Sequence, residues 1–431
     1  MKSTLEKKWE RLRNSTLARN AAWLFAGQGL SFVTQGAYFI VLARLLGASQ
    51  YGLLSGAVAL VATVSQYSTL GSGLLFLRYV SQDRNNFSLY WGNILLSIFS
   101  MSSLLVVGLY FFGNHLIGHG NLLVLVPLAI SDCLFQQFSS CTGQVFQTYE
   151  KMKISATLSL LANVFRLIIA IAFVVVLKRA DAWQWALASL AVSFAAAAIA
   201  FLTVTRHFGR PRFSLSLLWR RAGEGFIFAI SGSTTAVYND IDKVVLTHDG
   251  LVRENGLYSM AYRIINIGSM PIMSIVSAAF PRFFQEGAKG IIGTVPMAKV
   301  LLKRTLVLAV ALTASMFLMA PIIPHLVGKS YIESISALRW LCLIPIFRCF
   351  HLSAGDAIAG AGLQKYRLLS QSVAALGNLC VNIVLIPQYG WHGAAWTSLG
   401  TDGALGIMNW VALLYLAGRA RRLLAPKAMN L

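Results

Sequence analysis

The sequence predicts an all-α polytopic membrane protein with twelve transmembrane helices, six in each half of the chain. Composition gives the first indication, since 57% of the 431 residues are hydrophobic and only 12% are charged. A soluble domain carries about 25% charged residues. The second indication is that the apolar stretches are continuous rather than alternating, which favours membrane helices of about 20 residues over a membrane β-barrel.

Twelve apolar stretches follow one another along the chain. In the first half they cover residues 20–44, 52–77, 89–112, 121–149, 154–177 and 183–205. In the second half they cover residues 223–247, 256–283, 305–327, 334–362, 367–386 and 393–418. We therefore expect a cytoplasmic N-terminal segment (1–19), an N-terminal bundle (20–205), a basic cytoplasmic linker (206–222), a C-terminal bundle (223–418) and a cytoplasmic tail (419–431). Because six is an even number, the two halves have the same orientation, as in parallel transporter repeats.

The loops differ sharply in Lys and Arg content. If the N-terminus is cytoplasmic, the segments on that side hold 26 of the 36 Lys and Arg residues, and the opposite loops hold 6. Positive residues concentrate in cytoplasmic loops, so both termini are predicted to be cytoplasmic. The net charge of +21 then reflects membrane topology, with anionic lipid as a further partner, rather than nucleic-acid binding.

A shift of 204 residues aligns two segments of the chain. Residues 52–57 (GLLSGA) fall on residues 256–261 (GLYSMA), and Phe76 and Arg78 fall on Phe280 and Arg282. Transporters are often built from internal repeats, with the substrate site at the interface of the halves. The second segment also contains Pro271, which allows a bend or hinge because proline removes a helical hydrogen bond.

Charged residues occur at membrane depth, where each costs about 2.5–3.5 kcal/mol and usually faces protein or water. Asp240 and Lys243 are three residues apart and share a helix face, which favours an internal salt bridge. Arg166 and Arg263 have no carboxylate three or four residues away, so their partners come from other helices, water or an anionic substrate. Arginine suits phosphate because its planar fork donates two hydrogen bonds.

The sequence lacks the motifs of ATP hydrolysis, serine hydrolases and zinc enzymes, and the outer loops are short. We therefore expect a protein that is not an enzyme and that needs no cofactor or metal. The five cysteines lie within predicted spans and form no metal-type pair, so we interpret them as packing residues. They are Cys133, Cys141, Cys342, Cys349 and Cys380.

Five segments resemble motifs of the Wzx-type polysaccharide flippases, which belong to the MOP exporter superfamily. They are residues 44–52 (RLLGASQYG), 67–73 (YSTLGSG) with Arg78, 242–246 (DKVVL), 256–262 (GLYSMAY) with 280–282 (FPR), and 386–395 (IPQYGWHGAA). The resemblance implies two six-helix bundles around a central cavity. It also implies alternating access that moves an undecaprenyl-pyrophosphate-linked oligosaccharide across the bacterial inner membrane for O-antigen, capsule or exopolysaccharide synthesis. Polysaccharide polymerase and chain-length machinery are the implied protein partners.

Under this interpretation a set of basic residues contacts the pyrophosphate, and a set of aspartates couples transport to a cation. The basic candidates are Arg44, Arg78, Arg166, Lys243, Arg263 and Arg348, and the acidic candidates are Asp132, Asp240 and Asp242. Three alternatives stay open: a cation-coupled antiporter or lipid II flippase of the same superfamily, a membrane glycan polymerase or ligase, and a scaffold. An antiporter of cations favours an acidic cavity, and a lipid II flippase usually has more than twelve helices.

Overall fold

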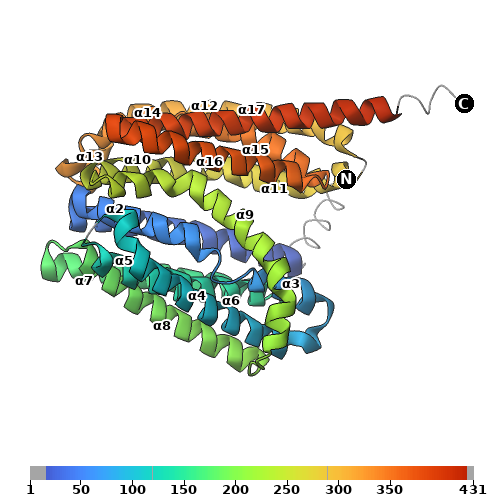
Figure 1. The fold of residues 1–431 in the computed structure, drawn as a ribbon, viewed down its shortest axis with the longest axis horizontal. Helices are drawn as coiled ribbons and strands as arrows, with labels where there is room; N and C mark the ends of the chain where they lie inside the picture. Colours follow the sequence, from blue (N-terminus) through green and yellow to red (C-terminus); the bar gives the residue numbers. More distant parts are fainter. Residues whose placement is uncertain (1–15, 119, 289, 425–431) are drawn as a thin grey trace, which may run out of the picture. The chain divides into compact units, whose positions relative to one another are not determined.

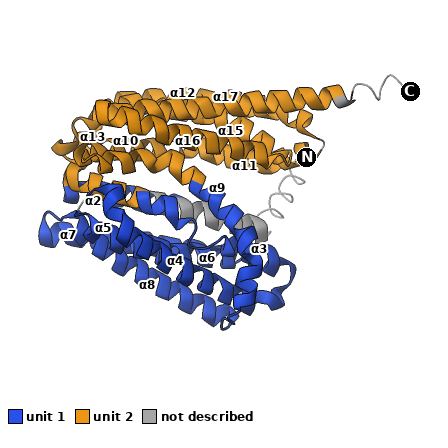
Figure 2. Cartoon of the chain, in the orientation of Figure 1, with its two compact units in different colours: residues 1–46, 60–233 blue, residues 47–59, 234–431 orange. Residues whose placement is uncertain are grey.

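The computed structural model describes residues 16–118, 120–288 and 290–424, and these are almost entirely helical (Figure 1). Contacts divide the chain into two compact units (Figure 2). Unit 1 contains the described residues up to Leu46 together with Leu60–Ser233, and unit 2 contains Gly47–Ala59 and the residues from Thr234 onward. The chain therefore passes from one unit to the other within two of its long helices.

Unit 1 is built from the first nine helical elements and the start of a tenth. They are α2 (Thr16–Ser65), α3 (Ser72–Gln82), η1 (Arg84–Asn86), α4 (Phe87–Ile117), α5 (Leu122–Ala129), the π-helix η2 (Ile130–Gln136), α6 (Gln137–Thr148), α7 (Met152–Leu177), α8 (Ala182–Phe208) and the beginning of α9 (Leu215–His248). Helix α2 is interrupted at Gly47, where φ is 67°. Glycine adopts this left-handed region without steric cost, so the chain can change direction there.

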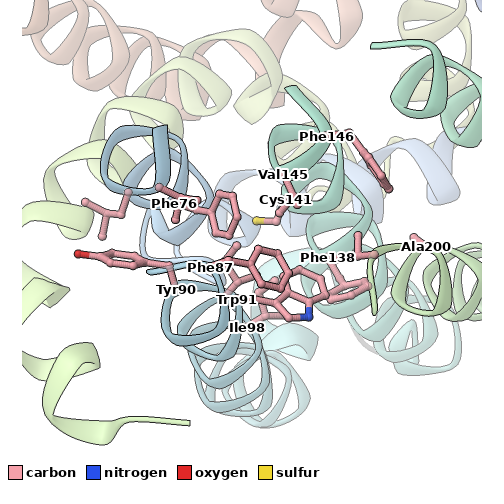
Figure 3. Packing of buried hydrophobic residues seen from close by; sticks show 14 of the residues in the cluster. Phe76, Phe87, Tyr90, Trp91, Ile98, Phe138, Cys141, Val145, Phe146 and Ala200 are labelled. Carbon is pink, nitrogen blue, oxygen red and sulfur yellow. The ribbon is translucent and has the colours of Figure 1, made fainter. Parts of the chain in front are cut away.

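An aromatic cluster forms the core of unit 1 (Figure 3). Phe87 and Trp91 of α4 lie at its centre. The Trp91 ring is 5.5 Å from the Phe138 ring, and the Phe76 ring meets the Phe87 ring edge-on at 5.9 Å. Each such aromatic pair adds about 0.5–1.5 kcal/mol beyond the burial of its surface. Because these residues come from α3, α4 and α6, the cluster fixes the three helices to one another.

Unit 2 contains the end of α9 and the remaining helices. They are α10 (Val252–Gly268), α11 (Met270–Gly287), α12 (Ile291–Met319), η3 (Ala320–Ile322), α13 (Ile323–Val327), η4 (Lys329–Tyr331), α14 (Ser334–Leu341), α15 (Ile344–Gly360), α16 (Gln364–Tyr389) and α17 (Trp391–Leu424). Its core is more aliphatic and centres on Phe283 of α11, with small residues of α15 such as Ala354 and Ala357 against it. Small residues allow membrane helices to approach closely.

The prediction of an all-helical protein with many spans is confirmed. Among the described residues, nine helices are long and apolar enough to cross a membrane, and ten if the bent pair of α10 and α11 counts as one span. That pair bends by 48° beside Pro271, where the sequence predicts a bend. Each of the twelve predicted stretches coincides with helix, but not all as one apolar span. Helix α9 is too polar to be among these spans, and the stretch 52–77 is broken where Leu70 and Gly71 have positive φ.

The predicted linker, residues 206–222, is only partly a loop. Helix α8 ends at Phe208, and α9 already begins at Leu215. The predicted tail begins inside α17, which continues to Leu424. The predicted N-terminal segment lies mostly outside the described residues.

Candidate functional site

A polar cavity of about 410 Å³ lies within unit 2. Helices α9, α10, α11, α15 and α16 contribute its walls, so segments that are far apart in sequence meet there. The lining residues are Thr235, Tyr238, Asn239, Asp240, Tyr262, Asn266, Met273, Arg348, His351, Leu352, Arg367 and Gln371. Most of these side chains carry hydrogen-bonding groups, which is unusual for helices that are otherwise apolar enough to span a membrane.

Arg348 of α15 is one of two arginines that line this cavity, with Arg367 of α16. Its Nη1 donates to the amide oxygen of Asn266 at 2.9 Å, and its Nη2 donates to the Tyr262 hydroxyl at 3.2 Å. The guanidinium carbon lies 5.7 Å from the centre of the Tyr262 ring, within the range of a cation–π contact. Two side chains of α10 therefore hold the orientation of this arginine.

Asp240 and Lys243 of α9 form an ion pair on one helix face, as the sequence predicts. Lys243 Nζ also donates to the backbone oxygen of Asn239 at 3.3 Å and lies 4.4 Å from the centre of the Tyr262 ring. Asp240 lines the cavity, whereas its lysine partner lies beside it. This pair is consequently neutralised locally, and Tyr262 lies against both Lys243 and Arg348.

The other charged groups around the cavity also have partners. Arg367 Nη1 lies 2.9 Å from Asp356 Oδ1, and the aspartate side chain is only 6% exposed. His351 Nε2 lies 3.7 Å from Asp402 Oδ1, and both side chains are less than 10% exposed. These contacts join α15 to α16 and to α17. His351, Asp356 and Asp402 lie within the predicted spans 334–362 and 393–418, but the sequence does not indicate a role for them.

Arg348 differs from these paired groups. Within the ranges that the structure describes, no carboxylate oxygen lies within 4.0 Å of its guanidinium. Its hydrogen-bond partners, Asn266 and Tyr262, are uncharged groups. The buried Asp402 carboxylate of α17 is close enough to attract the guanidinium electrostatically, although it makes no direct ion pair with it. The planar fork of Arg348 suits phosphate or carboxylate.

Asp242 faces a different environment from Asp240, although both are on α9. It is buried, and its carboxylate accepts from the Tyr258 hydroxyl, from the Ser398 hydroxyl at 3.0 Å and from the Lys243 backbone nitrogen at 2.7 Å. The Ser398 and Tyr258 oxygens are 2.9 Å apart. This network connects α9, α10 and α17, and Asp242 is not among the residues that line the cavity.

A separate polar network in unit 1 contains two further predicted site residues. Arg166 of α7 donates to Gln136 Oε1 at 2.8 Å and to Ser193 Oγ at 3.3 Å. Ser131 lies 2.9 Å from Ser193 and donates to Asp132 at 3.2 Å. Arg166 thus finds its partners on other helices. Asp132 and Gln136 both lie in the π-helix η2, a type of distortion that is frequent at functional sites.

The remaining predicted basic residues do not line the unit 2 cavity. Arg78 of α3 is exposed and forms an ion pair with Glu224, which Arg221 also contacts at 3.4 Å. Arg44 is exposed on the first part of α2. Arg263 of α10 is half-buried and is not among the residues that line the unit 2 cavity. The structure therefore brings Asp240, Lys243 and Arg348 together, and Arg166 with Asp132, but not the full predicted set.

Arg367, Tyr238 and Gln371 are cavity residues that sequence reasoning missed. Arg367 stands at the start of a predicted span, where a basic residue is expected as a topology signal. The sequence does contain a signal for the pairing of Arg367. Asp356 is an acidic residue inside the preceding predicted span, only eleven positions earlier, and a short turn separates the two spans. Within the described residues, no group of three or more His, Cys, Asp or Glu side chains could hold a metal ion. The arrangement offers hydrogen bonds and charge rather than a nucleophile.

One sequence profile matches more than half of the chain. It describes the family "Polysaccharide biosynthesis protein" and matches residues 17–286. The chain belongs to this family. The resemblance to the polysaccharide flippases of the MOP superfamily is thereby confirmed. No curated protein matches this polysaccharide biosynthesis protein in sequence.

Solved structures resemble the fold over almost the whole chain. An inward-facing multidrug resistance MATE family transporter of the MOP superfamily has a TM-score of 0.76 at 12% identity, covering 90% of this chain and 96% of that one. A lipid II flippase in an inward closed conformation has a TM-score of 0.67 at 15% identity, covering 93% and 87%. A MOP superfamily transporter from Pyrococcus furiosus, described as having a binding pocket of reverse polarity, has a TM-score of 0.61 at 15% identity, covering 94% and 95%. The fold of this polysaccharide biosynthesis protein is therefore that of the MOP transporters, a multi-pass membrane fold.

Proposed function

We propose that this polysaccharide biosynthesis protein is a flippase that moves an undecaprenyl-pyrophosphate-linked oligosaccharide across the bacterial cytoplasmic membrane by alternating access. The product would feed O-antigen, capsule or exopolysaccharide assembly. Family membership supports the general activity, and the transporter fold supports a role that is not enzymatic. The lipid tail of such a substrate can stay in the bilayer while its charged and sugar parts pass through protein.

The observation that carries this proposal is the charge of Arg348. It faces a polar cavity of about 410 Å³ and is held by the uncharged groups of Tyr262 and Asn266. A pyrophosphate that crosses a low-dielectric region needs a compensating positive charge, because its attraction to a cation is several times stronger there than in water. Arg348 supplies that charge without first breaking an ion pair.

The hydroxyl and amide groups around Arg348 suit the sugar part of the same substrate. Tyr238, Asn239 and Gln371 line the cavity and present donors and acceptors. A transporter of amphipathic cations would instead favour uncompensated carboxylates at this place. Here Asp240 is paired with Lys243, Asp356 is paired with Arg367, and the field of Arg348 acts on the buried Asp402. This distribution favours an anionic substrate over a cationic one.

Coupling to a cation remains part of the proposal, with Asp132, Asp240 and Asp242 as candidates. Arg44, Arg78, Arg166, Lys243 and Arg263 remain candidate contacts for the substrate along its path. The excess of Lys and Arg in the loops of one side supports a cytoplasmic location for both termini. Membrane lipids, polysaccharide polymerase and chain-length proteins are the expected partners.

The test is transport by purified protein. Proteoliposomes would contain a polyprenyl-pyrophosphate-linked sugar, and a membrane-impermeant reagent would report how much of it reaches the opposite leaflet. We expect Arg348→Gln to slow transfer at least tenfold, because a hydrogen bond to a charged group contributes about 1.5–3 kcal/mol. Arg348→Lys keeps the charge but loses the planar fork. Its transfer rate should therefore lie between those of the wild type and Arg348→Gln.

The matched control is Arg339→Gln, which removes one positive charge from an exposed site in the same unit. It should transfer the lipid at the normal rate. Transfer by Arg348→Gln that equals this control would remove the cavity from the mechanism. A wild-type protein that leaves the lipid in place and instead makes a new glycosidic product would refute the flippase assignment and favour a polymerase or ligase.

A further inference from the structure

The segment between α8 and α9 and the first turns of α9 expose basic and aromatic side chains together. Arg210, Arg212 and Arg220 are exposed, and no ion pair or hydrogen bond of their side chains is found among the described residues. Phe213 is 64% exposed and Trp219 is 77% exposed. Exposed aromatic rings beside arginines are typical of the membrane–water interface, where the rings enter the headgroup region and the charges meet lipid phosphates.

An apolar groove of about 600 Å³ in unit 1 ends at this segment. Its lining side chains are aliphatic and aromatic, and Phe213 is the lining residue that comes from this segment. The lining residues are Leu95, Leu96, Ile98, Phe99, Leu134, Phe135, Phe138, Phe194, Ala197, Ala198, Phe201 and Phe213. Apart from Phe213, these residues come from α4, η2, α6 and α8. Phe99 and Phe194 are more than half exposed, so the groove is open along its side.

Backbone contacts fix the segment at the end of the groove. The Arg212 nitrogen donates to the Ser88 oxygen of α4 at 2.8 Å. Gly92, one turn further along α4, makes this approach possible, because a Cβ at that position would lie 2.0 Å from the Arg212 oxygen. The backbone that carries Arg210 and Arg212 is therefore held in a defined position. The two arginines flank Pro211, and Arg212 directly precedes Phe213.

We propose that this groove and the arginines at its end form a binding site for an anionic phospholipid of the cytoplasmic leaflet. One acyl chain lies in the groove, and the phosphate lies on Arg210 and Arg212. Basic segments next to membrane helices bind anionic headgroups at about 1 kcal/mol for each Lys or Arg. The site belongs to unit 1 and does not depend on the role of the polar cavity of unit 2.

The length of the groove suits an acyl chain. Along α8 its lining extends from Phe194 to Phe201, which is about 10 Å at a rise of 1.5 Å per residue. The hydrocarbon half of a bilayer is about 15 Å thick. The groove therefore takes a chain from one leaflet, oriented along the helices as lipid chains are, with the phosphate at the arginine end.

The first experiment changes the charges. Purified full-length protein in detergent would be titrated with phosphatidylglycerol and, separately, with phosphatidylcholine of the same chains, and bound lipid would be counted by native mass spectrometry. The double variant Arg210→Gln/Arg212→Gln should bind phosphatidylglycerol roughly 25-fold more weakly. The matched control is Arg421→Gln/Arg422→Gln, which removes two exposed charges from the end of α17 and should bind as the wild type does.

The second experiment fills the groove. Ala198→Trp places a large ring among the lining residues, whereas Ala195→Trp places the same ring on an exposed part of α8 that does not line the groove. We expect only Ala198→Trp to release phosphatidylglycerol. A polyprenyl diphosphate serves as competitor in the same assay.

Three results would overturn the proposal. The first is equal binding of phosphatidylcholine and phosphatidylglycerol by the wild type. The second is equal loss of lipid in Arg210→Gln/Arg212→Gln and in its control, or in the two tryptophan variants. The third is displacement of the phospholipid by the polyprenyl diphosphate at lower concentration, because the groove would then belong to the transported lipid.

Discussion

Gly52 and Gly256 lie directly against each other within unit 2. A Cβ on Gly52 would be 2.5 Å from the Gly256 nitrogen and 1.7 Å from the Val252 oxygen, and a Cβ on Gly256 would be 1.9 Å from the Ala48 oxygen. These two glycines are also aligned with each other when the sequence is shifted by 204 residues. Equivalent residues meet in this way where two copies of a segment contact each other about a two-fold axis. The contact supports the repeat that the sequence suggests.

We predict that Gly52→Ala and Gly256→Ala each destabilise the protein by about 1–3 kcal/mol, the usual cost of adding a methyl group to a closely packed site. The obstructing atoms are backbone atoms, so rotation of a side chain cannot relieve the clash. Thermal unfolding in detergent would show a lower midpoint. The control is Gly377→Ala in α16, where the new Cβ meets nothing within 4 Å and helix propensity favours alanine by about 1 kcal/mol. Unchanged midpoints for both variants would mean that the two segments do not pack this closely.

The ion pair between Arg367 and Asp356 should be strongly asymmetric in its response to mutation. Asp356 is 6% exposed and Arg367 is 20% exposed, so Arg367→Gln leaves a buried carboxylate alone. Breaking a buried pair in this way costs about 3–5 kcal/mol. We expect Asp356→Asn to cost less, because the arginine reaches solvent more easily. The double variant should be more stable than Arg367→Gln, since neither charge then remains unpaired.

An exposed ion pair gives the control for these Arg367 and Asp356 variants. Arg253 and Glu333 are 2.9 Å apart, but both side chains are about half exposed. Surface pairs contribute about 0–1 kcal/mol, so Arg253→Gln should change the unfolding midpoint little. A similar loss of stability in Arg253→Gln and Arg367→Gln would contradict the burial of the Asp356 carboxylate.

The network around Asp242 predicts an order of effects. Tyr258 and Ser398 both donate to its carboxylate, and Tyr258→Phe removes one donor without removing the ring. A buried group that loses a partner costs about 1–3 kcal/mol. Ser398→Ala should cost less, because an aliphatic hydroxyl is a less acidic and therefore weaker donor to a carboxylate than the Tyr258 phenol. The exposed Tyr389→Phe serves as control in thermal unfolding. A larger loss in Ser398→Ala than in Tyr258→Phe would contradict this arrangement.

The helices of this protein are predictable from sequence because a span needs about 20 apolar residues regardless of its neighbours. The pair of Asp240 and Lys243 is predictable for a similar reason, since residues three apart on a helix share a face. Contacts between helices have no such local rule. Arg367 is paired with Asp356 only because a short turn brings α16 back along α15, and the partners of Arg348 come from α10, more than eighty residues away.

The sequence also gives no ranking among the intramembrane arginines. Arg263 and Arg348 are both basic residues inside predicted spans, and the motif around Arg263 makes it the more conspicuous of the two. Only the packing of α10 distinguishes them. Tyr262 and Asn266 line the cavity, but Arg263 lies on another face of the same helix. A difference of one position on a helix turns a side chain by about 100°, so a sequence motif alone does not identify the face that meets a substrate.

This difference in placement gives the last prediction. At equal levels of membrane insertion, Arg348→Gln should reduce transfer of a polyprenyl-pyrophosphate-linked sugar more than Arg263→Gln does, because Arg348 lines the cavity and Arg263 is not among its lining residues. Tyr262→Phe tests the same geometry. It keeps the ring beneath the guanidinium and removes one acceptor, so transfer should fall less than in Arg348→Gln. If Arg263→Gln abolished transfer while Arg348→Gln transferred normally, the substrate path would run along the other face of α10, and the motif around Arg263 would be the better guide to it.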